Sequence, residues 1–193
     1  MTYFKRLIGK RCYLSPCSQA DAAKWTEWDN DLEVTIPLGD EAFTPISVEK
    51  QQERIDEISK NQSHVFTIVD LETDAPIGRC MLFNLVQVNR MATLGIVIGE
   101  KTYWNRGYGQ EAIKLLLDYG FNLLNLNNIM LGVAAYNLRA INCYQKVGFK
   151  EIGRRRKTKI IGGQRYDVIY MDILAEEFES DYVKQLIEQT EMK

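Results

Sequence analysis

The spacing of apolar residues along the chain predicts an alternation of strands and helices. Between residues 110 and 124 the apolar positions recur at i, i+3, i+4, i+7, i+8 and i+11, the period of an amphipathic helix that packs one face on a sheet. Seven other segments are short runs rich in Val, Ile, Leu and Phe, and they predict strands at 11–14, 64–71, 77–86, 92–98, 129–135, 149–156 and 165–174. The run 129–135 is apolar throughout and fits a central strand that is buried on both faces.

Capping residues predict where further helices begin and end. Ser18 with Asp21 three residues later resembles a capping box, so we expect a helix to open there. A second helix is expected over 47–61. Asn137 is placed to cap a short helix, and Gly148 supplies the left-handed residue that ends it.

Turn residues then connect the strands into one unit. The sequence of 72–76 is typical of a hairpin turn, and Gly162-Gly163 joins the last two strands. The acidic tail, 176–193, is expected to be helical. Because no repeat or linker interrupts the pattern, we predict a single α+β domain over residues 1–193, with a mixed, mainly antiparallel sheet of six to seven strands flanked by helices.

Composition supports an ordinary globular domain. The 193 residues are 46% hydrophobic and 26% charged, which is enough to build one core. The first 14 residues interleave cations with apolar residues, unlike a signal peptide, and no apolar run approaches the roughly 20 residues that span a bilayer. We therefore expect a cytoplasmic protein without a membrane partner.

The Cys and His content excludes several kinds of chemistry. The four cysteines show no metal-ligand spacing, so we expect reduced thiols and no metal site. His64 is the only histidine, which excludes mechanisms that need a His dyad or a His-rich metal site and so removes most hydrolases.

Charge is unevenly distributed along the chain. The net charge of −2 argues against direct nucleic-acid binding. The segment 25–49 contains seven acids and no Lys or Arg, whereas 154–159 contains five cations in six residues. Solvated surface is the simplest interpretation of both segments.

The segment with the clearest chemistry is a strand, a glycine loop and the amphipathic helix in succession. Free backbone N–H groups of such a loop, together with the positive end of the helix, form a cradle for an anion such as a pyrophosphate. A side chain at Gly107 or Gly109 would hinder close approach to the phosphate oxygens. The stretch 107–112 also fits the Gly-x-Gly-x-x-Ala dinucleotide fingerprint, but 129–137 lacks the acid that would hold a ribose, which argues against a nicotinamide enzyme.

The segment 133–149, VAAYNLRAINCYQKVGF, makes the prediction more specific. Together with the glycine loop it resembles the GNAT superfamily of acyl-CoA N-acyltransferases, in the branch of ribosomal-protein alanine and serine N-acetyltransferases and spermidine N-acetyltransferases. The resemblance covers about 11–178 and is specific over 94–172. Trp104 departs from the commonest family loop, which has Gln or Arg there, but a Tyr-Trp pair is usual in the ribosomal-protein branch.

The resemblance implies a GNAT fold, acetyl-CoA as cosubstrate and no metal. The backbone of one strand would pair with the pantetheine arm, the loop would hold the pyrophosphate, and Asn137 would contact the pantetheine or cap the next helix. The implied cofactor-binding residues are Ile96, Val97, Ile98, Trp104, Asn105, Arg106, Gly107, Tyr108, Gly109, Gln110, Asn137 and Lys146.

Tyr144 is the implied catalytic residue, with its hydroxyl directed at the thioester sulfur. The implied reaction is direct attack of a neutral amine on the thioester, with a strand N–H near Val97 as donor to the developing oxyanion. A carboxylate or a water chain must take the proton of the amine. Glu100 is either that base or a loop acid, and we favour the loop acid. Cys143 has no His partner and is expected to be a structural thiol.

The acceptor is the least determined part of the sequence-based hypothesis. Acids such as Glu33 and Glu100 are candidates for binding a cationic amine. The positions where spermidine acetyltransferases carry acids align with Met81, Asn84 and Thr93, which favours a protein or peptide N-terminal amine over a polyamine or an antibiotic. A non-catalytic acyl-CoA sensor and a homodimer stay open as alternatives.

Overall fold

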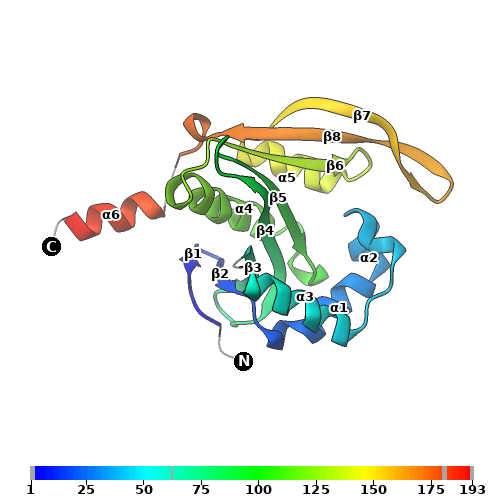
Figure 1. The fold of residues 1–193 in the computed structure, drawn as a ribbon, viewed down its shortest axis with the longest axis horizontal. Coiled ribbons are helices and arrows are strands. Elements are labelled where there is room, and N and C mark those ends of the chain that lie inside the picture. Colours follow the sequence, from blue (N-terminus) through cyan, green and yellow to red (C-terminus); the bar gives the residue numbers. More distant parts are fainter. Residues whose placement is uncertain (1–2, 62, 180–181, 192–193) are drawn as a thin grey trace.

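One eight-stranded sheet organises the molecule (Figure 1). The structure is a computed structural model that describes residues 3–61, 63–179 and 182–191. The strand order is β1-β2-β3-β4-β5-β6-β8-β7. The strands are β1 (Leu7–Ile8), β2 (Cys12–Pro16), β3 (His64–Asp70), β4 (Pro76–Val86), β5 (Met91–Ile98), β6 (Asn128–Ala134), β7 (Lys150–Ile161) and β8 (Gln164–Leu174).

All neighbouring strands pair antiparallel except β5 and β6, which are parallel. The predicted mixed, mainly antiparallel sheet flanked by helices is therefore confirmed. The sheet has one strand more than the six to seven expected, because β1 is only two residues long and leaves no periodic pattern in the sequence.

Helices cover both faces of the sheet. They are α1 (Ala22–Asn30), α2 (Leu32–Thr35), α3 (Val48–Lys60), α4 (Tyr108–Asp118), α5 (Leu138–Val147) and α6 (Val183–Glu191). The apolar side of α4 packs with β4, β5, β6 and β8 in the larger core. On the other face, Trp25 and Trp28 of α1 and Ile55 of α3 pack with Val65 and Val97 in a smaller core.

The first predicted helix is divided in the structure. A single turn of 3-10 helix, Gln19–Asp21, precedes α1, and the Ser18 N–H donates to the Asp21 carboxylate at 2.8 Å. The short helix α2 and a 3-10 turn at Asp40–Phe43 follow in the acidic segment, where no helical period is visible in the sequence.

The predicted helix 110–124 changes its hydrogen bonding before it ends. It begins at Tyr108, and α4 gives way after Asp118 to a π-helical turn, Tyr119–Leu123, in which the Leu124 N–H donates to the Tyr119 carbonyl at 3.1 Å. This turn places Gly120 so close to the sheet that an added Cβ would lie 2.7 Å from the side chain of Ile129. Close packing on β6 therefore replaces the regular helix end.

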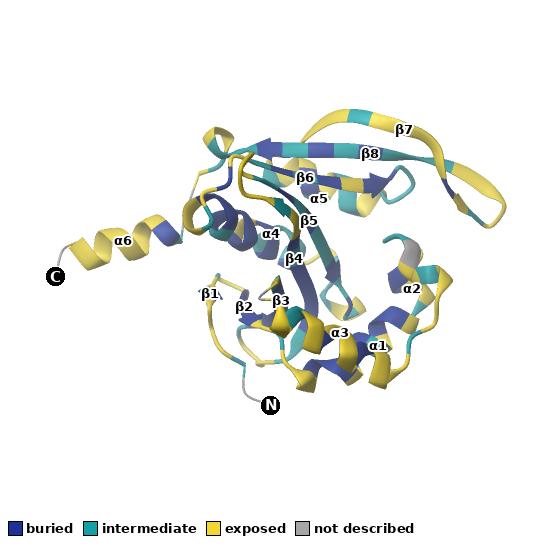
Figure 2. Cartoon of the chain, viewed as in Figure 1, coloured by how far each residue is buried: buried dark blue, intermediate teal, exposed yellow. Residues whose placement is uncertain are grey.

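In the C-terminal part, β7 and α6 are mostly exposed, whereas β8 contributes buried residues to the core. β7 is the outermost strand and carries the basic run, and the hairpin of β7 and β8 turns at two glycines with positive φ (Figure 2). A 3-10 turn, Ala175–Glu177, leads to α6, whose residues are mostly exposed. The predicted helical tail agrees with α6, while residues 180, 181, 192 and 193 lie outside the described residues.

Candidate active site

The sheet opens between β5 and β6. The two strands pair only through Met91–Thr93 of β5 and Asn128–Met130 of β6. Beyond that point β5 stays paired with β4 as far as Ile98, while β6 stays paired with β8 as far as Ala134. Figure 1 shows β5 bending away with β4 as β6 continues beside β8. Two strand edges therefore face each other without pairing.

Strand alternation determines which backbone groups face this opening. The Gly99 N–H donates to the Ile77 carbonyl at 2.9 Å, in the register that pairs Gly78 with Ile98. Since hydrogen-bonded and non-bonded pairs alternate in an antiparallel ladder, the backbone of Val97 faces β4 and that of Ile96 and Ile98 faces the opening.

This geometry identifies which N–H near Val97 is placed to serve as the expected oxyanion donor. An N–H at Val97 would be directed into the β4 ladder, so Ile98 is the better candidate to donate toward the opening. The Ile98 carbonyl already accepts from the Trp104 indole N–H at 2.7 Å. Of the three predicted strand residues, Ile96 therefore offers both backbone groups, Ile98 offers its N–H, and Val97 contributes its side chain.

A cleft of about 350 Å³ lies along the opening. The strand end, the glycine loop, the start of α4 and α5 all contribute to its walls. The predicted residues that line it are Ile96, Val97, Ile98, Trp104, Asn105, Gly107, Tyr108, Gly109, Gln110, Asn137, Tyr144 and Lys146. Arg106 is not among the lining residues, because its guanidinium lies over the rings of Tyr103 and Tyr108, 5.6 and 6.0 Å from their centroids.

The glycine loop directs the start of α4 into the cleft. Gly107 has a φ of +86°, a left-handed conformation that favours glycine, and its carbonyl accepts the first helical bond, from the Glu111 N–H at 3.1 Å. The N–H groups of Tyr108, Gly109 and Gln110 precede that bond and have no partner within the helix. They are free to bind an anion at the positive end of the helix.

Two sets of hydrogen bonds, of which only the one from Tyr108 is buried, fix the position of this helix end. The Tyr108 hydroxyl donates to Asp70 at 2.6 Å, and Glu111 accepts from the backbone N–H groups of Arg11 and Cys12 at 2.6 and 3.1 Å. The bond to Asp70 is the main cause that raises the pKa of Tyr108 to about 12. Burial acts to raise the pKa of Asp70, but the hydrogen bonds from Tyr108 and Thr73 outweigh it and lower the pKa.

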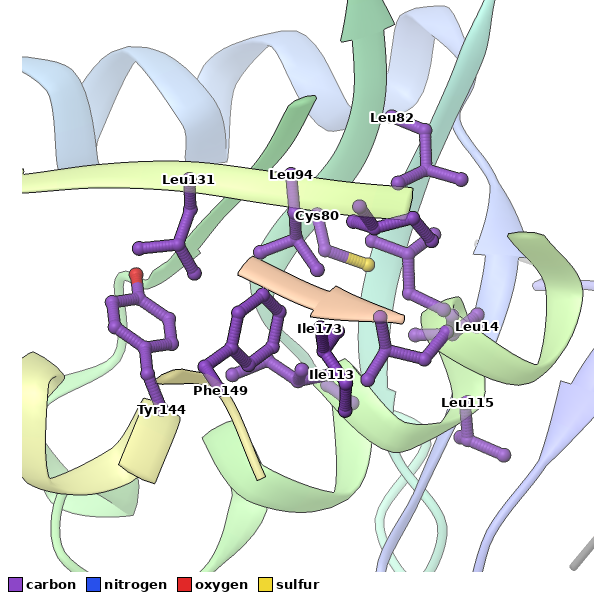
Figure 3. Packing of buried hydrophobic residues seen from close by; sticks show 14 of the residues in the cluster. Leu14, Cys80, Leu82, Leu94, Ile113, Leu115, Leu131, Tyr144, Phe149 and Ile173 are labelled. Atoms are coloured by element: carbon purple, nitrogen blue, oxygen red, sulfur yellow. The ribbon is translucent and has the colours of Figure 1, made fainter. Parts of the chain in front are cut away.

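Tyr144 belongs to α5 and lines the cleft, and Figure 3 shows it beside Phe149 in the core. Its side chain is 8% exposed, and its ring packs against Phe149 with centroids 5.8 Å apart. Within the described chain its hydroxyl has no hydrogen-bond partner, and Figure 3 shows that it points away from the helix. Burial raises the pKa of Tyr144, so the phenol stays protonated and is available as a hydrogen-bond donor.

The end of α2 and the three residues after it close one side of the cleft, and we call residues 34–38 the strap. Its Val34, Pro37 and Leu38 line the cleft. The Asn137 side chain caps α5 by accepting from the Ala140 N–H at 3.1 Å, and its Nδ2 donates to the Pro37 carbonyl at 2.9 Å. Of the two roles expected for Asn137, the structure shows the cap, and it adds a contact to the strap that the sequence did not reveal.

Cations lie near the entrance of the cleft. Lys146 lines it, as does Arg139, whose guanidinium stacks on the Trp104 ring 3.6 Å from the centroid. Arg139 was not among the predicted site residues, although a cation in the first turn of a helix beside an anion cradle is a signal that could have identified it.

The two predicted acceptor acids are held by cations outside the cleft. Glu33 is bonded to Lys101. Glu100 accepts from Lys24 at 2.6 Å and from the Trp28 indole at 3.0 Å. Burial acts to raise the pKa of Glu100, but these two partners outweigh it and lower the pKa. The geometry therefore favours a structural role for Glu100.

Few other chemically reactive side chains line the cleft. Cys143 lines the cleft, and burial raises the pKa of its thiol to about 11, which suppresses its reactivity. Among the described residues no cluster of His, Cys, Asp or Glu has the geometry to hold a metal ion. No helix in the same residues is long and apolar enough to cross a membrane.

A sheet opened between two parallel strands, with an anion-binding helix end at the opening, defines the class of GNAT acyltransferases. Residues 11–150 match the family described as the acetyltransferase (GNAT) domain. The chain belongs to this family and is an N-acetyltransferase that acts on amines.

The chain is similar to relatives with different acceptors. It is 30% identical to "Uncharacterized N-acetyltransferase p20" of Bacillus licheniformis over 174 residues, which are 89% of this chain and 97% of that protein. It is 32% identical to "Putative ribosomal N-acetyltransferase YdaF" of Bacillus subtilis over 104 residues, covering 54% of this chain and 56% of that protein. A solved structure of spermidine N-acetyltransferase from Vibrio cholerae, in complex with CoA and spermine, superposes with a TM-score of 0.80 at 25% identity, covering 88% of this chain and 98% of the other.

Acetyl-CoA, which GNAT acetyltransferases use, fits the cleft on its own chemistry. The unpaired edge at Ile96 and Ile98 suits an amide-containing arm, and the free N–H groups at the start of α4 suit a pyrophosphate. Lys146 and Arg139 add positive charge for phosphate groups.

Proposed function

We propose that this protein transfers an acetyl group from acetyl-CoA to the N-terminal α-amine of a protein or peptide. Acetyl-CoA supplies the acetyl group as an activated thioester. The start of α4 binds its phosphates, the edge of β5 orients its arm, and the strap excludes water. Tyr144 donates a hydrogen bond that stabilises the thiolate, and the Ile98 N–H faces the carbonyl oxygen.

The observation that carries the choice of acceptor is the absence of any carboxylate among the described residues that line the cleft. The amine must therefore arrive neutral or lose a proton to water before it attacks, and the proton that its nitrogen releases as the C–N bond forms and the C–S bond breaks passes through water to the leaving thiolate. An α-amine with a pKa of about 7.7–8.0 is roughly one third neutral at pH 7.5, whereas an alkylamine with a pKa of about 10.4 is only about 0.1% neutral. A site without a base thus favours an α-amine by about two orders of magnitude.

A small alkylamine is the second candidate, and the similarity to the spermine-bound structure supports it. A non-catalytic acyl-CoA sensor is the third alternative, and a test for acetyl transfer distinguishes it from the two enzymatic functions.

The test is release of CoA thiol from acetyl-CoA with a panel of N-terminal peptides, polyamines and aminoglycosides. We expect turnover with peptides, and a kcat/KM that rises with pH along the ionisation of the peptide amine. Tyr144→Phe is expected to lose most of kcat and to keep its affinity for acetyl-CoA, since it removes only the hydroxyl. Tight acetyl-CoA binding with no thiol release would favour the sensor, and turnover of polyamines alone would favour the second candidate.

A further inference from the structure

A second hollow of about 800 Å³ lies on the other face of the sheet, between α1, α3 and β4. Its floor includes Arg79 of β4, which is paired in register with Val97 of β5. Val97 in turn lines the first cleft. The hollow and the cleft therefore adjoin across two neighbouring strands.

The hollow contains a buried ion pair that uses only half of its hydrogen-bonding capacity. Arg79 Nη2 lies 2.6 Å from Asp29 Oδ1, and the two residues are 8% and 6% exposed. Arg79 Nη1 and Asp29 Oδ2 have no hydrogen-bond partner in the part of the chain that the structure describes. Arg and carboxylate side chains commonly pair through two parallel bonds, and this single bond leaves one donor and one acceptor of the pair unused.

Two further buried polar atoms of the hollow, the Trp25 indole N–H and Gln51 Oε1, have no hydrogen-bond partner within residues 3–61, 63–179 and 182–191. Both side chains are 2% exposed. Among the described residues, four of the five buried side-chain atoms that lack a partner belong to residues of this hollow. Each such group costs about 1–3 kcal/mol if nothing binds it. Their concentration at one place indicates a ligand with both donors and acceptors.

We propose that this hollow binds the peptide backbone of the acceptor, with its carbonyl accepting from Arg79 and its N–H donating to Asp29. This inference rests on the proposed function and specifies the substrate class further: acceptors carry an amide near the reacting amine. A polyamine offers only donors, so it would leave Arg79 and Trp25 unpaired and bring an ammonium beside a guanidinium.

The charge of the lining agrees with this choice. Its charged side chains are two acids and two arginines, and His64 lies at its edge. A balanced lining gives no net attraction to a polycation, whereas a neutral peptide group is satisfied by the mixed donors and acceptors.

The test compares an alanyl peptide amide with an alkylamine of similar size that lacks the amide. The variant is Asp29→Leu with Arg79→Met, which removes both charges together, because replacing a whole buried pair by apolar side chains preserves folding better than removing one partner. Lys50→Met with Glu53→Leu is the control, since it removes an exposed ion pair on α3 whose two residues do not line the hollow. Asp29→Asn is the second variant and keeps nearly the same shape.

The proposal predicts that the double variant loses at least about tenfold in kcat/KM for the peptide, mainly through KM, because two hydrogen bonds to charged groups are lost. Its rate with the alkylamine and its affinity for acetyl-CoA stay unchanged, and the control variant resembles the wild type. Equal losses for both acceptors would show a structural role and overturn the proposal, as would an unchanged peptide KM in both Asp29 variants. A wild type that acetylates no peptide would instead refute the proposed function.

Discussion

Two substitutions of Asn137, which contacts the strap, should affect the free energy of unfolding differently while changing the release of acetyl-CoA to the same extent. Asn137→Ala removes both the cap of α5 and the bond to the Pro37 carbonyl. Asn137→Ser keeps a cap of similar strength and removes only the bond to Pro37, because serine is too short to reach it and has no amide donor.

The magnitudes follow from the two bonds. Loss of a cap costs about 1 kcal/mol, and loss of a neutral hydrogen bond costs about 1 kcal/mol. We expect Asn137→Ala to lower the free energy of unfolding by about 2 kcal/mol and Asn137→Ser by about 1 kcal/mol. For a domain of this size these losses correspond to Tm decreases of about 4–8 °C and 2–4 °C.

The rate at which each variant releases acetyl-CoA should not follow its free energy of unfolding. Both variants lose the same contact to the strap, so both should release acetyl-CoA faster by up to about fivefold, the equivalent of 1 kcal/mol. Urea unfolding measures the free energy of unfolding, and stopped-flow displacement of bound acetyl-CoA measures its release rate. Tyr136→Phe is a further check, because the Tyr136 hydroxyl donates to the strap at Ile36, 2.7 Å away, without capping a helix. The reasoning would be refuted if Asn137→Ser released acetyl-CoA at the wild-type rate while Asn137→Ala did not.

Further predictions concern the glycine loop, its anchor and the thiol. Gly107→Ala should lower the free energy of unfolding by about 1–2 kcal/mol, because Gly107 has a left-handed φ. In Gly109→Ala the added Cβ would lie in the cleft, 3.6 Å from Cys143 Sγ. This variant should therefore keep the Tm of the free protein and show a smaller increase in Tm when acetyl-CoA binds. Tyr108→Phe should lose about 1.5–3 kcal/mol at pH 7. Because folding lowers the pKa of Asp70, the stabilisation by its carboxylate is present above the unfolded pKa and lost as the pH falls through the folded pKa. Urea titrations should therefore show that the stability difference between Tyr108→Phe and the wild type narrows below about pH 4. A difference that stays constant with pH would contradict the role of Asp70. Intact mass after incubation with acetyl-CoA should show no acetyl group on Cys143; a mass increase of one acetyl group would contradict direct transfer.

Much of the fold was predictable because its elements have strong local signals. The period of 110–124, the Asn137 cap and the Gly148 stop each appear in the sequence and in the structure, as α4 and α5. The strap was not predictable, since α2 has only four residues and depends on contacts from a segment 100 positions away. The π-helical turn likewise depends on close packing against β6.

The candidate site was predictable in outline and not in its pairings. Gly107 could be predicted from its spacing before the amphipathic helix, and Tyr144 from the family resemblance. The half-used pair of Asp29 and Arg79 joins two elements 50 residues apart and leaves no local pattern. The partners of Glu100 could not be predicted for the same reason, although they decide whether that carboxylate is available as a base.

The position of β7 has a consequence for how copies of the protein meet. An outermost strand of 12 residues presents unpaired backbone groups that could add to the same strand of another copy and extend the sheet from molecule to molecule. Its four consecutive cations, Arg154, Arg155, Arg156 and Lys157, would then lie close to those of the second copy, and the register of pairing with β8 shifts at this point. Mutual repulsion along this edge therefore protects the chain against self-association into fibrils.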